Sequence, residues 1–529
     1  MKYSFVQLMD LPVEILMIIF KKLNNDEVLY SLKDINIRLD QIIGDPIFTN
    51  EISLIKYNSL ADLTSALPDI VLNRFYFQIL PKICHKIKCF TLETLSIERI
   101  LLAAEYCNLN QLNIFCMNEE IDIQLFTDKS RLLHIFQKQI VTLCVSGRRV
   151  PCDRYSEIYT LANIFSNILL NFTNLLHLKF YSLYDYKGAY LSFVNQSPMF
   201  FSSTLVELHV NVYNFNDCLY LLDGRLPQLH TLFVKVFHIL SFFHSPGIKE
   251  EKLLNLKCFS LICFNDSDIY DEAIVPHLHR MINLEKLLLY LVIICNTTFI
   301  DGNNLKKNII NHFPLLRQFI FNIHSKFSFD NEMNEMHFLS NEDIQDTFTD
   351  FKDYEVIASV DYFQNDGSGQ SHIYSYPYTL RHYNDITNNF PRGLFNYVQV
   401  VTLFDERPFE HEFFMRLVQA FPFLKDLTIT NTEPQKYKQY SNSNDENQDF
   451  PIIEYPHLIY LNLFEIHDDY AEQFLLDTKT CFLNDIHLSI DDDVIQRVTQ
   501  NFTRDATRNN YSKVKTVYRY QSVDLSKYC

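Results

Sequence analysis

Glycine is scarce in this chain, with 9 residues among 529. Phosphate-binding loops need several glycines at fixed spacing, because only glycine lets the backbone come close to a phosphate group. The only close pair, Gly367 and Gly369, lies in a polar stretch. We therefore expect neither a P-loop nor a dinucleotide-binding fold, and we expect no cofactor.

The chain also lacks a surplus of basic charge. It carries 46 Lys and Arg against 64 Asp and Glu, which gives a formal net charge of −18. Proteins that bind nucleic acid present a positive surface that displaces counterions from the phosphates. We therefore expect no nucleic-acid partner.

Paired cysteines at metal-binding spacing are missing. The chain has 12 cysteines, but no two of them form a CxxC pair, and Cys84/Cys89 and Cys258/Cys263 are too far apart for a zinc knuckle. No HExxH sequence occurs either. Because no secretory leader precedes the first helix, we expect reduced thiols in a cytoplasmic or nuclear protein.

Long apolar runs are absent as well. The longest one, Leu287–Cys295, is much shorter than the ~20 residues that a membrane-spanning helix needs. Asp10, Pro12 and Glu14 interrupt the apolar character of the N-terminus. We therefore expect a soluble protein with no membrane partner.

The segment from Leu8 to Ile43 predicts three short helices. Pro12 suits the first turn of the first helix, because its missing N–H needs no partner there, and Asn25 or Asp26 is expected to cap the second. The apolar residues at helical spacing are Ile15, Ile18, Ile19 and Leu23 in the first helix, Leu29 and Leu32 in the second, and Ile37 or Leu39, Ile42 and Ile43 in the third.

This N-terminal unit has more apolar surface than about forty residues can bury by themselves. The excess must be covered either by another protein or by the rest of this chain. Periodicity alone does not distinguish these two possibilities.

The order of residues in this segment resembles the F-box motif: Leu11-Pro12-x-Glu14-Ile15-Leu16, then Ile19-Phe20-x-x-Leu23, then an acidic cap before Val28-Leu29 and Leu32. The resemblance covers about residues 5–50; the chain has no Trp, so its third helix departs from the family pattern. The resemblance implies a three-helix module that binds a Skp1-like protein and, through it, a cullin of a ubiquitin ligase. The implied Skp1-contacting or helix-packing residues are Leu11, Pro12, Ile15, Ile19, Phe20, Leu23, Leu29 and Leu32.

A second pattern recurs after residue 80: an apolar residue, two variable residues, an apolar residue, one variable residue and another apolar residue. Its spacing averages about 29 residues, at the long end of the leucine-rich repeat range. It occurs at Ile87/Phe90/Leu92, Leu109/Leu112/Ile114, Ile140/Leu143/Val145, Leu175/Leu178/Phe180, Leu205/Leu208/Val210, Leu229/Leu232/Val234, Leu256/Phe259/Leu261, Leu284/Leu287/Leu289 and Leu316/Phe319/Phe321.

We expect each of these patterns to lead into a short strand and helices to fill the intervals. The predicted helices are 97–106, 155–170, 268–281 and 304–312. Strands and helices that alternate at such a spacing predict parallel strands on one side and helices on the other. The alternative is a set of unrelated buried strands in an ordinary α/β domain. Leucine-rich repeats usually carry an Asn after the strand, but Tyr213, Phe237, Phe264 and Val292 stand there instead, so the repeats must close differently.

The pattern stops for roughly eighty residues and then resumes. Residues 327–349 predict a loop, and residues 355–363 and 372–380 predict a β-hairpin. The later patterns are Val398/Val401/Leu403, Leu424/Leu427/Ile429, Leu458/Leu461/Leu463 and Leu483/Ile486/Leu488, separated by predicted helices at 409–421, 469–476 and 493–502. Residues 431–449 predict a disordered surface loop, and residues 514–520 a final edge strand.

Together these patterns predict an α/β fold: a small all-α F-box-like three-helix module followed by a curved leucine-rich-repeat-like solenoid of parallel strands and helices. The predicted domains are the module at 5–50, the array at 80–325, a loop and hairpin insertion at 326–395, and the continued array at 396–520.

Candidate catalytic or metal-binding groups are few. His277 with His279 and His467 with Asp468 and Asp469 are the closest histidine and acid groupings, and neither supplies three ligands at metal spacing. Residues 491–493, all Asp, stand where a helix should begin, so helix capping explains them better than calcium binding does. We expect no catalytic site and no metal.

The function predicted from the sequence is therefore binding: an adaptor that presents an unidentified protein substrate to a ubiquitin ligase. The alternative is a scaffolding repeat protein whose helical module is sealed against its own first repeat.

Overall fold

The fold is described from a computed structural model. The structure describes residues 8–58, 63–116, 124–127, 130–147, 155–182, 190–193, 200–241, 251–296, 298–329, 338–349, 351, 354–436 and 451–520. The chain divides into two compact units, the first formed by residues 1–293 and 307–320 and the second by residues 294–306 and 321–529.

The N-terminal helices lie close to their predicted positions. They are η1 (Leu8–Asp10), α1 (Val13–Phe20), α2 (Asn25–Leu32), α3 (Ile37–Ile43) and α4 (Pro46–Thr49). Pro12 immediately precedes α1. The residue before α2 is Asn24, not the predicted Asn25 or Asp26, and its backbone N–H donates to Glu27. Leu39 is buried in α3 whereas Ile37 is exposed, which resolves the alternative that the sequence left open.

The segment that follows joins these helices to the first sheet of the same unit. It contains β1 (Glu51–Ser53), the hairpin β2 (Ile55–Asn58) and β3 (Leu63–Ala66), then α5 (Asp69–Arg74), the π-helical turn η2 (Phe75–Ile79), α6 (Leu80–Ile83) and η3 (Cys84–Lys86). Arg74 donates to the carbonyl of Lys33 at 3.2 Å and lies over the Tyr30 ring. The Lys86 ammonium donates to the carbonyl of Gly44 at 2.8 Å. The contacts of Arg74 and Lys86 hold α2 and α3 against the segment.

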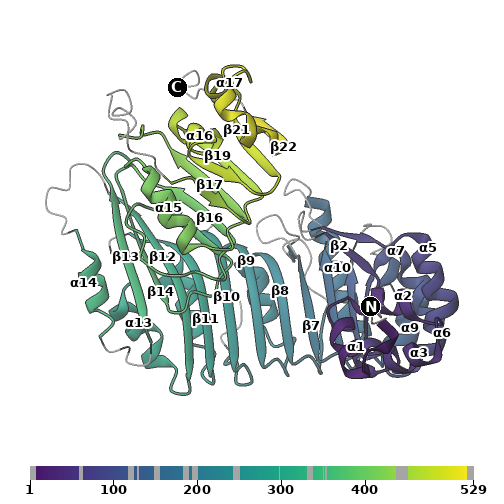
Figure 1. Cartoon of the computed structure of the whole chain (residues 1–529). Helices are drawn as coiled ribbons and strands as arrows, with labels where there is room; N and C mark the ends of the chain where they lie inside the picture. The colour runs from purple at the N-terminus through teal and green to yellow at the C-terminus, as the bar shows by residue number, and fades with distance from the viewer. Residues whose placement is uncertain are drawn as a thin grey trace. The chain divides into compact units, whose positions relative to one another are not determined.

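A large, mostly parallel sheet has twelve strands in the order β1-β4-β5-β6-β7-β8-β9-β10-β11-β12-β14-β13 (Figure 1). Its parallel strands follow one another in sequence order, as the repeated pattern predicts. They are β4 (Cys89–Glu93), β5 (Gln111–Phe115), β6 (Thr142–Gly147), β7 (His177–Ser182), β8 (Glu207–Asn214), β9 (Thr231–His238), β10 (Cys258–Ser267), β11 (Lys286–Ile294) and β12 (Gln318–Ser328).

Each repeated pattern leads into a strand, which confirms this prediction. In β5, Leu112 and Ile114 are buried while Gln111, Asn113 and Phe115 are half-buried. This alternation follows from the two-residue period of a strand, whose successive side chains point to opposite faces. One face of β5 is therefore covered, and the other carries the half-buried residues, whereas in β11 the residues of both faces are buried.

Helices stand between most strands of the large sheet. They are α7 (Thr94–Leu101), α9 (Arg131–Phe136), α10 (Tyr155–Asn171), α11 (Phe215–Leu221), η5 (Tyr270–Ile274) with α12 (Val275–Leu278), and α13 (Gly302–Asn308) with η6 (Ile310–His312). The predicted helices 97–106, 155–170, 268–281 and 304–312 each overlap one of these. The sequence did not predict α11, which begins with a capping box between Asn214 and Asp217.

In the second unit, β12 pairs with an antiparallel hairpin of β13 (Val356–Phe363) and β14 (Ser368–Ser375). The predicted hairpin is confirmed, but its second strand begins and ends earlier than the predicted 372–380. The preceding segment was predicted to be a loop, but it contains α14 (Asn341–Asp346). Ser340 and Asp343 form its capping box, a signal that can be read from the sequence.

The second unit also contains a six-stranded parallel sheet, in the order β15-β16-β17-β19-β21-β22, and the pair β18-β20. The strands are β15 (His382–Ile386), β16 (Val400–Phe404), β17 (Asp426–Asn431), β18 (Ile453–Tyr455), β19 (Tyr460–Ile466), β20 (Thr480–Phe482), β21 (Ile486–Asp491) and β22 (Val514–Tyr520). The helices are α15 (His411–Ala420), α16 (Asp468–Leu475), α17 (Asp492–Thr499), η8 (Asp505–Thr507) and α18 (Arg508–Ser512). The final edge strand was predicted correctly.

Three details of this sheet differ from the predictions. Leu483 is half exposed, because Phe482 of β20 takes the buried position beside it. Helix α17 ends earlier than predicted, because Gln500, Asn501 and Phe502 have positive φ angles. Of the predicted surface loop, residues 437–449 lie outside the described residues, whereas Gln435 is buried and its backbone N–H donates to Asp469.

Acidic and amide side chains accept backbone N–H groups at the ends of several strands. Glu93, the last residue of β4, accepts from Leu95, and Asp405 after β16 accepts from Asn388 and Arg407. Asn431, the last residue of β17, accepts from Glu433 and donates to the carbonyl of Arg407, so an Asn does close this segment. These bonds satisfy partly buried backbone groups that would otherwise be costly.

Candidate partner-binding face of the N-terminal helices

Helix α1 presents apolar residues on two sides. Successive residues are about 100° apart around a helix, so Leu16 and Phe20 share one stripe and Ile15 and Ile19 share another. Leu16 is fully buried and Phe20 is 3% exposed, whereas Ile15, Ile18 and Ile19 are 42%, 57% and 39% exposed. One stripe therefore packs inside this chain, and the other is exposed in the part of the chain that the structure describes. We call Ile15, Ile18 and Ile19 the α1 face.

Packing within the unit fixes which side of α1 points outward. The Phe20 ring meets the Phe48 ring of α4 edge-on, with centroids 6.5 Å apart. The Arg38 guanidinium donates to the carbonyls of Met9 and Leu11, in the latter case at 2.6 Å. Arg38 thus ties α3 to the start of α1 and holds the α1 face away from the module's own core.

Further exposed aliphatic residues lie on or beside the same helices. Leu23 stands between α1 and α2, and Ile37 in the first turn of α3 is 79% exposed. The neighbours of Ile37, Asn36 and Arg38, both contact the segment before α1. Ile37 therefore lies at the end of the module where α1 begins, and it extends the apolar surface there.

Polar groups fix the second and third helices to each other. The Lys33 ammonium lies 2.8 Å from Asp40 and donates to it. Although burial opposes the change, this hydrogen bond and the Lys33 charge lower the pKa of Asp40. In the first turn of α2, burial raises the pKa of Asp26. The contact between Lys33 and Asp40 thus joins the end of α2 to α3.

The structure separates the eight residues predicted to contact Skp1 or to pack the helices. Pro12, Ile15, Ile19 and Leu23 are exposed, and Leu11 and Leu32 are half-buried. Phe20 and Leu29 are buried inside this chain, so their place is in helix packing and not on a partner-binding surface. The sequence prediction left out Ile18, although its three-residue spacing from Ile15 places it on the same stripe.

The two histidine groupings have local structural roles. His277 contacts the carbonyl of Ala273, and His279 contacts the carbonyl of Asn308, each at 2.7 Å. The ring of His279 stacks on that of His312. His467 precedes α16, and its ring nitrogen lies 3.3 Å from the backbone N–H of Asp469.

The aspartates at 491–493 begin α17. Asp491 accepts the backbone N–H of Asp493 at 2.9 Å, which is the capping role that the sequence suggested. Among the residues that the structure describes, no group of three or more His, Cys, Asp or Glu is arranged to hold a metal ion.

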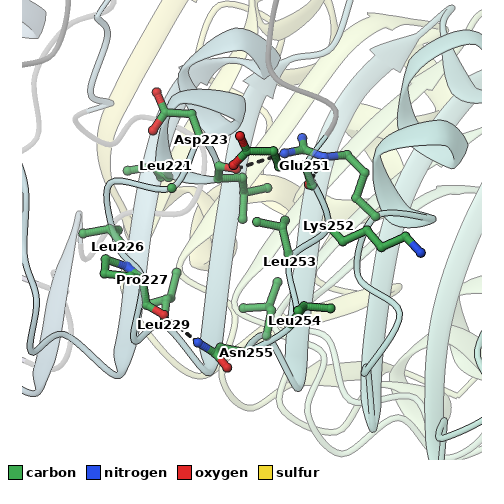
Figure 2. Close-up of a pocket in the computed structure, with 14 residues that line it drawn as sticks. Leu221, Asp223, Leu226, Pro227, Leu229, Glu251, Lys252, Leu253, Leu254 and Asn255 are labelled. Atoms are coloured by element: carbon green, nitrogen blue, oxygen red, sulfur yellow. Dashed lines mark hydrogen bonds between the residues drawn. The ribbon is translucent and has the colours of Figure 1, made fainter.

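A pocket of about 250 Å³ lies between the segment after α11 and the segment before β10. Figure 2 shows that leucines, among them Leu226, Leu229 and Leu253, form much of its lining. Its polar contacts join one segment to the next: Asn255 donates to the carbonyl of Pro227, and Arg280 donates to that of Glu251. These hydrogen bonds hold neighbouring segments of the chain together. Neither of them pairs an acidic side chain with a basic one, as a catalytic site would need.

No helix in the described part of the chain is long and apolar enough to cross a membrane. A scan against known protein families and a search of curated proteins find no match to this chain.

Proposed function

We propose that this protein is a substrate adaptor of a ubiquitin ligase of the Skp1–cullin–F-box type. The α1 face binds a Skp1-like protein and, through it, a cullin. The strands and helices that follow bind a protein substrate. In this proposal the protein has no catalytic site of its own and acts in the cytoplasm or nucleus.

The exposed α1 face is the observation that carries the proposal. A soluble helix normally turns its apolar residues inward and its charged residues outward. Helix α15 does so: Phe413, Phe414 and Leu417 are buried, and Glu412 and Arg416 are not. Burial of the exposed isoleucines of α1 in a complex is favourable by about 25 cal/mol for each Å² removed from water, which offsets the cost of ordering their side chains. Their position coincides with the sequence that resembles the F-box motif.

We further interpret the successive parallel strands and their intervening helices as an irregular leucine-rich-repeat solenoid. The order of the parallel strands β4 to β12 in the sheet follows their order in the sequence, and each of these nine strands carries the repeated apolar pattern. An array of this kind offers a broad face for a protein ligand. It would supply the substrate-binding half of the adaptor.

The direct test is binding of a purified Skp1-like protein to the whole chain, measured by calorimetry. We expect Ile19→Asp to weaken this binding at least about 100-fold, because the change places a charge in an apolar contact. Leu170→Asp is the matched control: Leu170, near the end of α10 in the same unit, is likewise about half exposed, and its binding should equal that of the unchanged protein. The Skp1–cullin proposal is contradicted if the unchanged protein does not bind, or if Ile19→Asp binds as tightly as the control.

Phe20→Asp is unsuitable for this test, although Phe20 is one of the residues that the resemblance implies. Its side chain is buried against Phe48, so a charge there would disrupt the helices themselves. If that variant lost binding, the cause could be either a lost contact with the Skp1-like protein or unfolding of the helices.

One observation favours the alternative of a scaffolding protein that joins no ligase. The module is fastened to the following segment by Arg74, by Lys86 and by the ion pair between Lys82 and Asp34, 2.6 Å apart. A structural cap would be fastened in the same way. Under this alternative, no Skp1-like protein binds and the Ile19→Asp variant has no effect on any interaction.

A further inference from the structure

Three neighbouring strands of the second unit are each preceded by an exposed ring. Tyr397, Phe423 and His457 stand three residues before β16, β17 and β19, and the first residues of these strands pair with one another. The three residues therefore have equivalent positions before consecutive strands of the sheet (Figure 1). Tyr397 is 62% and Phe423 is 46% exposed, and His457 is exposed as well. The rings of Phe423 and His457 stack, with centroids 5.5 Å apart. We call these three side chains the aromatic row.

Elsewhere in the chain the same position has a structural role. Before five other strands it is an Asn, whose side chain donates to a backbone carbonyl in the turn before the adjacent strand. These residues are Asn108, Asn174, Asn255, Asn283 and Asn484. A phenylalanine ring has no hydrogen-bond donor. Closure of the turn therefore does not account for an exposed ring at Phe423.

The turns that carry the aromatic row contain little charge. Apart from His457, residues 393–398, 421–424 and 455–458 include no acidic or basic residue. The charged residues directly beside these turns are of mixed sign: Arg392, Lys425 and Glu454. Single-stranded nucleic acid also stacks on aromatic rings, but it needs a basic surface along its phosphates. The aromatic row therefore favours an uncharged ligand.

The exposed area suits a short segment better than a folded partner. Because an aromatic side chain has ~150–250 Å² of surface, the exposed parts of the three rings total on the order of 300 Å². A stable interface between folded proteins buries about 800 Å² on each partner. A second copy of this chain would need more surface than the aromatic row provides, whereas a short extended segment would not.

The spacing of the aromatic row matches that of a polyproline II helix. Adjacent strands lie ~4.8 Å apart, so the backbone positions of Tyr397 and His457, two strands apart, are separated by about 9.6 Å. A polyproline II helix has three residues per turn and rises ~3.1 Å per residue, so it presents the same face about every 9.3 Å. A segment of this kind that crosses the three strands brings every third proline over a ring.

We propose that the aromatic row binds a proline-rich segment of a protein partner in the polyproline II conformation. Proline rings of the segment pack on Tyr397 at one end and on the stacked rings of Phe423 and His457 at the other. Such a segment is already extended before it binds, so binding orders little additional backbone. The inference names a substrate class for the proposed adaptor, and in that sense it rests on the proposed function. The binding site itself requires no ligase.

The test uses the whole chain and a fluorescent oligoproline peptide, with binding followed by anisotropy. A Gly–Ser peptide of equal length reports non-specific binding. We expect the oligoproline to bind, the Gly–Ser peptide not to bind, and both Tyr397→Asn and Phe423→Asn to weaken the oligoproline complex about tenfold. Because Asn occupies the equivalent position before other strands, both variants should unfold at the same temperature as the unchanged protein. Phe423→Leu keeps an apolar side chain without a ring and should give a smaller loss.

Tyr518→Asn is the matched control, because Tyr518 of β22 lies in the same unit and is 56% exposed. Its complex with the oligoproline should match that of the unchanged protein. Three results would overturn the inference: equal binding of the two peptides, an equal loss in the control, or a preference of about tenfold for single-stranded oligothymidylate over the oligoproline. The last would assign the aromatic row to nucleic acid.

The Ile19→Asp variant separates this inference from the proposed function. It should bind the oligoproline as tightly as the unchanged protein does. If no Skp1-like protein binds while the peptide binding persists, the proline-binding site stands and the ligase adaptor does not. If Skp1 binds but the peptide does not, the opposite holds.

Discussion

Two regions of this protein depart from ordinary burial in opposite directions. The N-terminal helices expose apolar residues, with Ile15, Ile18 and Ile19 on the outer side of α1. The hairpin β13–β14 and its neighbour β12 bury polar residues, among them His324, Gln370 and His372. Exposing an apolar face to water costs free energy. Burying polar groups also costs free energy unless each group keeps a hydrogen-bond partner.

The partners in the buried polar layer are specific. His324 contacts Gln370 at 2.9 Å, and His372 contacts Asn322 at 3.1 Å. Lys326 and Asp385 of β15 form an ion pair 3.0 Å long, and Gln370 donates to the Asp385 carbonyl. These contacts join the hairpin to the six-stranded sheet inside the second unit. The exposed apolar face of the first region fits the proposed binding to a partner, whereas the hydrogen bonds of the second region stabilise packing within its own unit.

The largest expected change in the free energy of unfolding comes from a buried residue of α15. Comparing it with the change for an α1 residue tests whether the α1 face contributes to the stability of the fold. Leu417→Ala removes a fully buried side chain from α15 and should lower the free energy of unfolding by about 2–5 kcal/mol. Ile18→Ala on α1 should change it by less than about 0.5 kcal/mol, because Ile18 is exposed. Urea unfolding with amide hydrogen exchange of each helix would measure both. A comparable loss for Ile18→Ala would show that α1 packs differently.

The intermediate effect tests the buried polar layer through its pH dependence. Burial, assisted by the charge of nearby His324 and opposed by Asp385, holds the pKa of His372 well below its usual 6.5. The unfolded chain therefore takes up a proton as the pH falls below about 6.5, while the folded chain does not. Stability should be fully present above this pH and fall by up to about 1.4 kcal/mol for each pH unit below it.

Hydrogen exchange of β12, β13 and β14 between pH 7.5 and pH 5 would report this effect. The ring of His372 also meets the rings of Tyr374, Tyr378 and Tyr383. Burial raises the pKa of Tyr374 and of Tyr383, so neither of these two hydroxyls titrates in this range. A His372→Gln variant should lose most of the dependence. The N-terminal helices provide the internal control, because the part of them that the structure describes contains no histidine.

The smallest effect concerns the attachment of the N-terminal helices. Lys82 and Asp34 form an ion pair, but both side chains are about half exposed. Water screens such a pair, so Lys82→Ala should cost less than about 0.5 kcal/mol. Thermal unfolding and Skp1 titration of this variant should both match the unchanged protein. A larger loss would mean that the module depends on this contact, which the scaffolding alternative predicts.

The repeated pattern was a reliable guide to the strands because it records burial on one face at a two-residue period. It missed β15, where a positive φ at Asp385 and a register shift break the alternation between Tyr383 and Ile386. It also missed α14, although Ser340 and Asp343 are typical capping residues. In β15 the positive φ of one residue interrupts the alternation, and in α14 two capping residues mark a helix. An apolar pattern that spans many residues shows neither feature.

The sequence by itself determined that the N-terminal helices have excess apolar surface and that parallel strands follow at a near-regular spacing. It could not decide between Ile19 and Phe20, which are adjacent, both apolar and both part of the F-box-like motif. Only the tertiary structure decided this, because Phe48 of α4 buries Phe20 and Arg38 of α3 fixes the start of α1. Likewise, Tyr397, Phe423 and His457 are far apart in the chain and become one row only through the register of three strands. Hydrophobic periodicity is a local property of the chain, whereas the choice of which apolar residue remains exposed depends on contacts between distant segments.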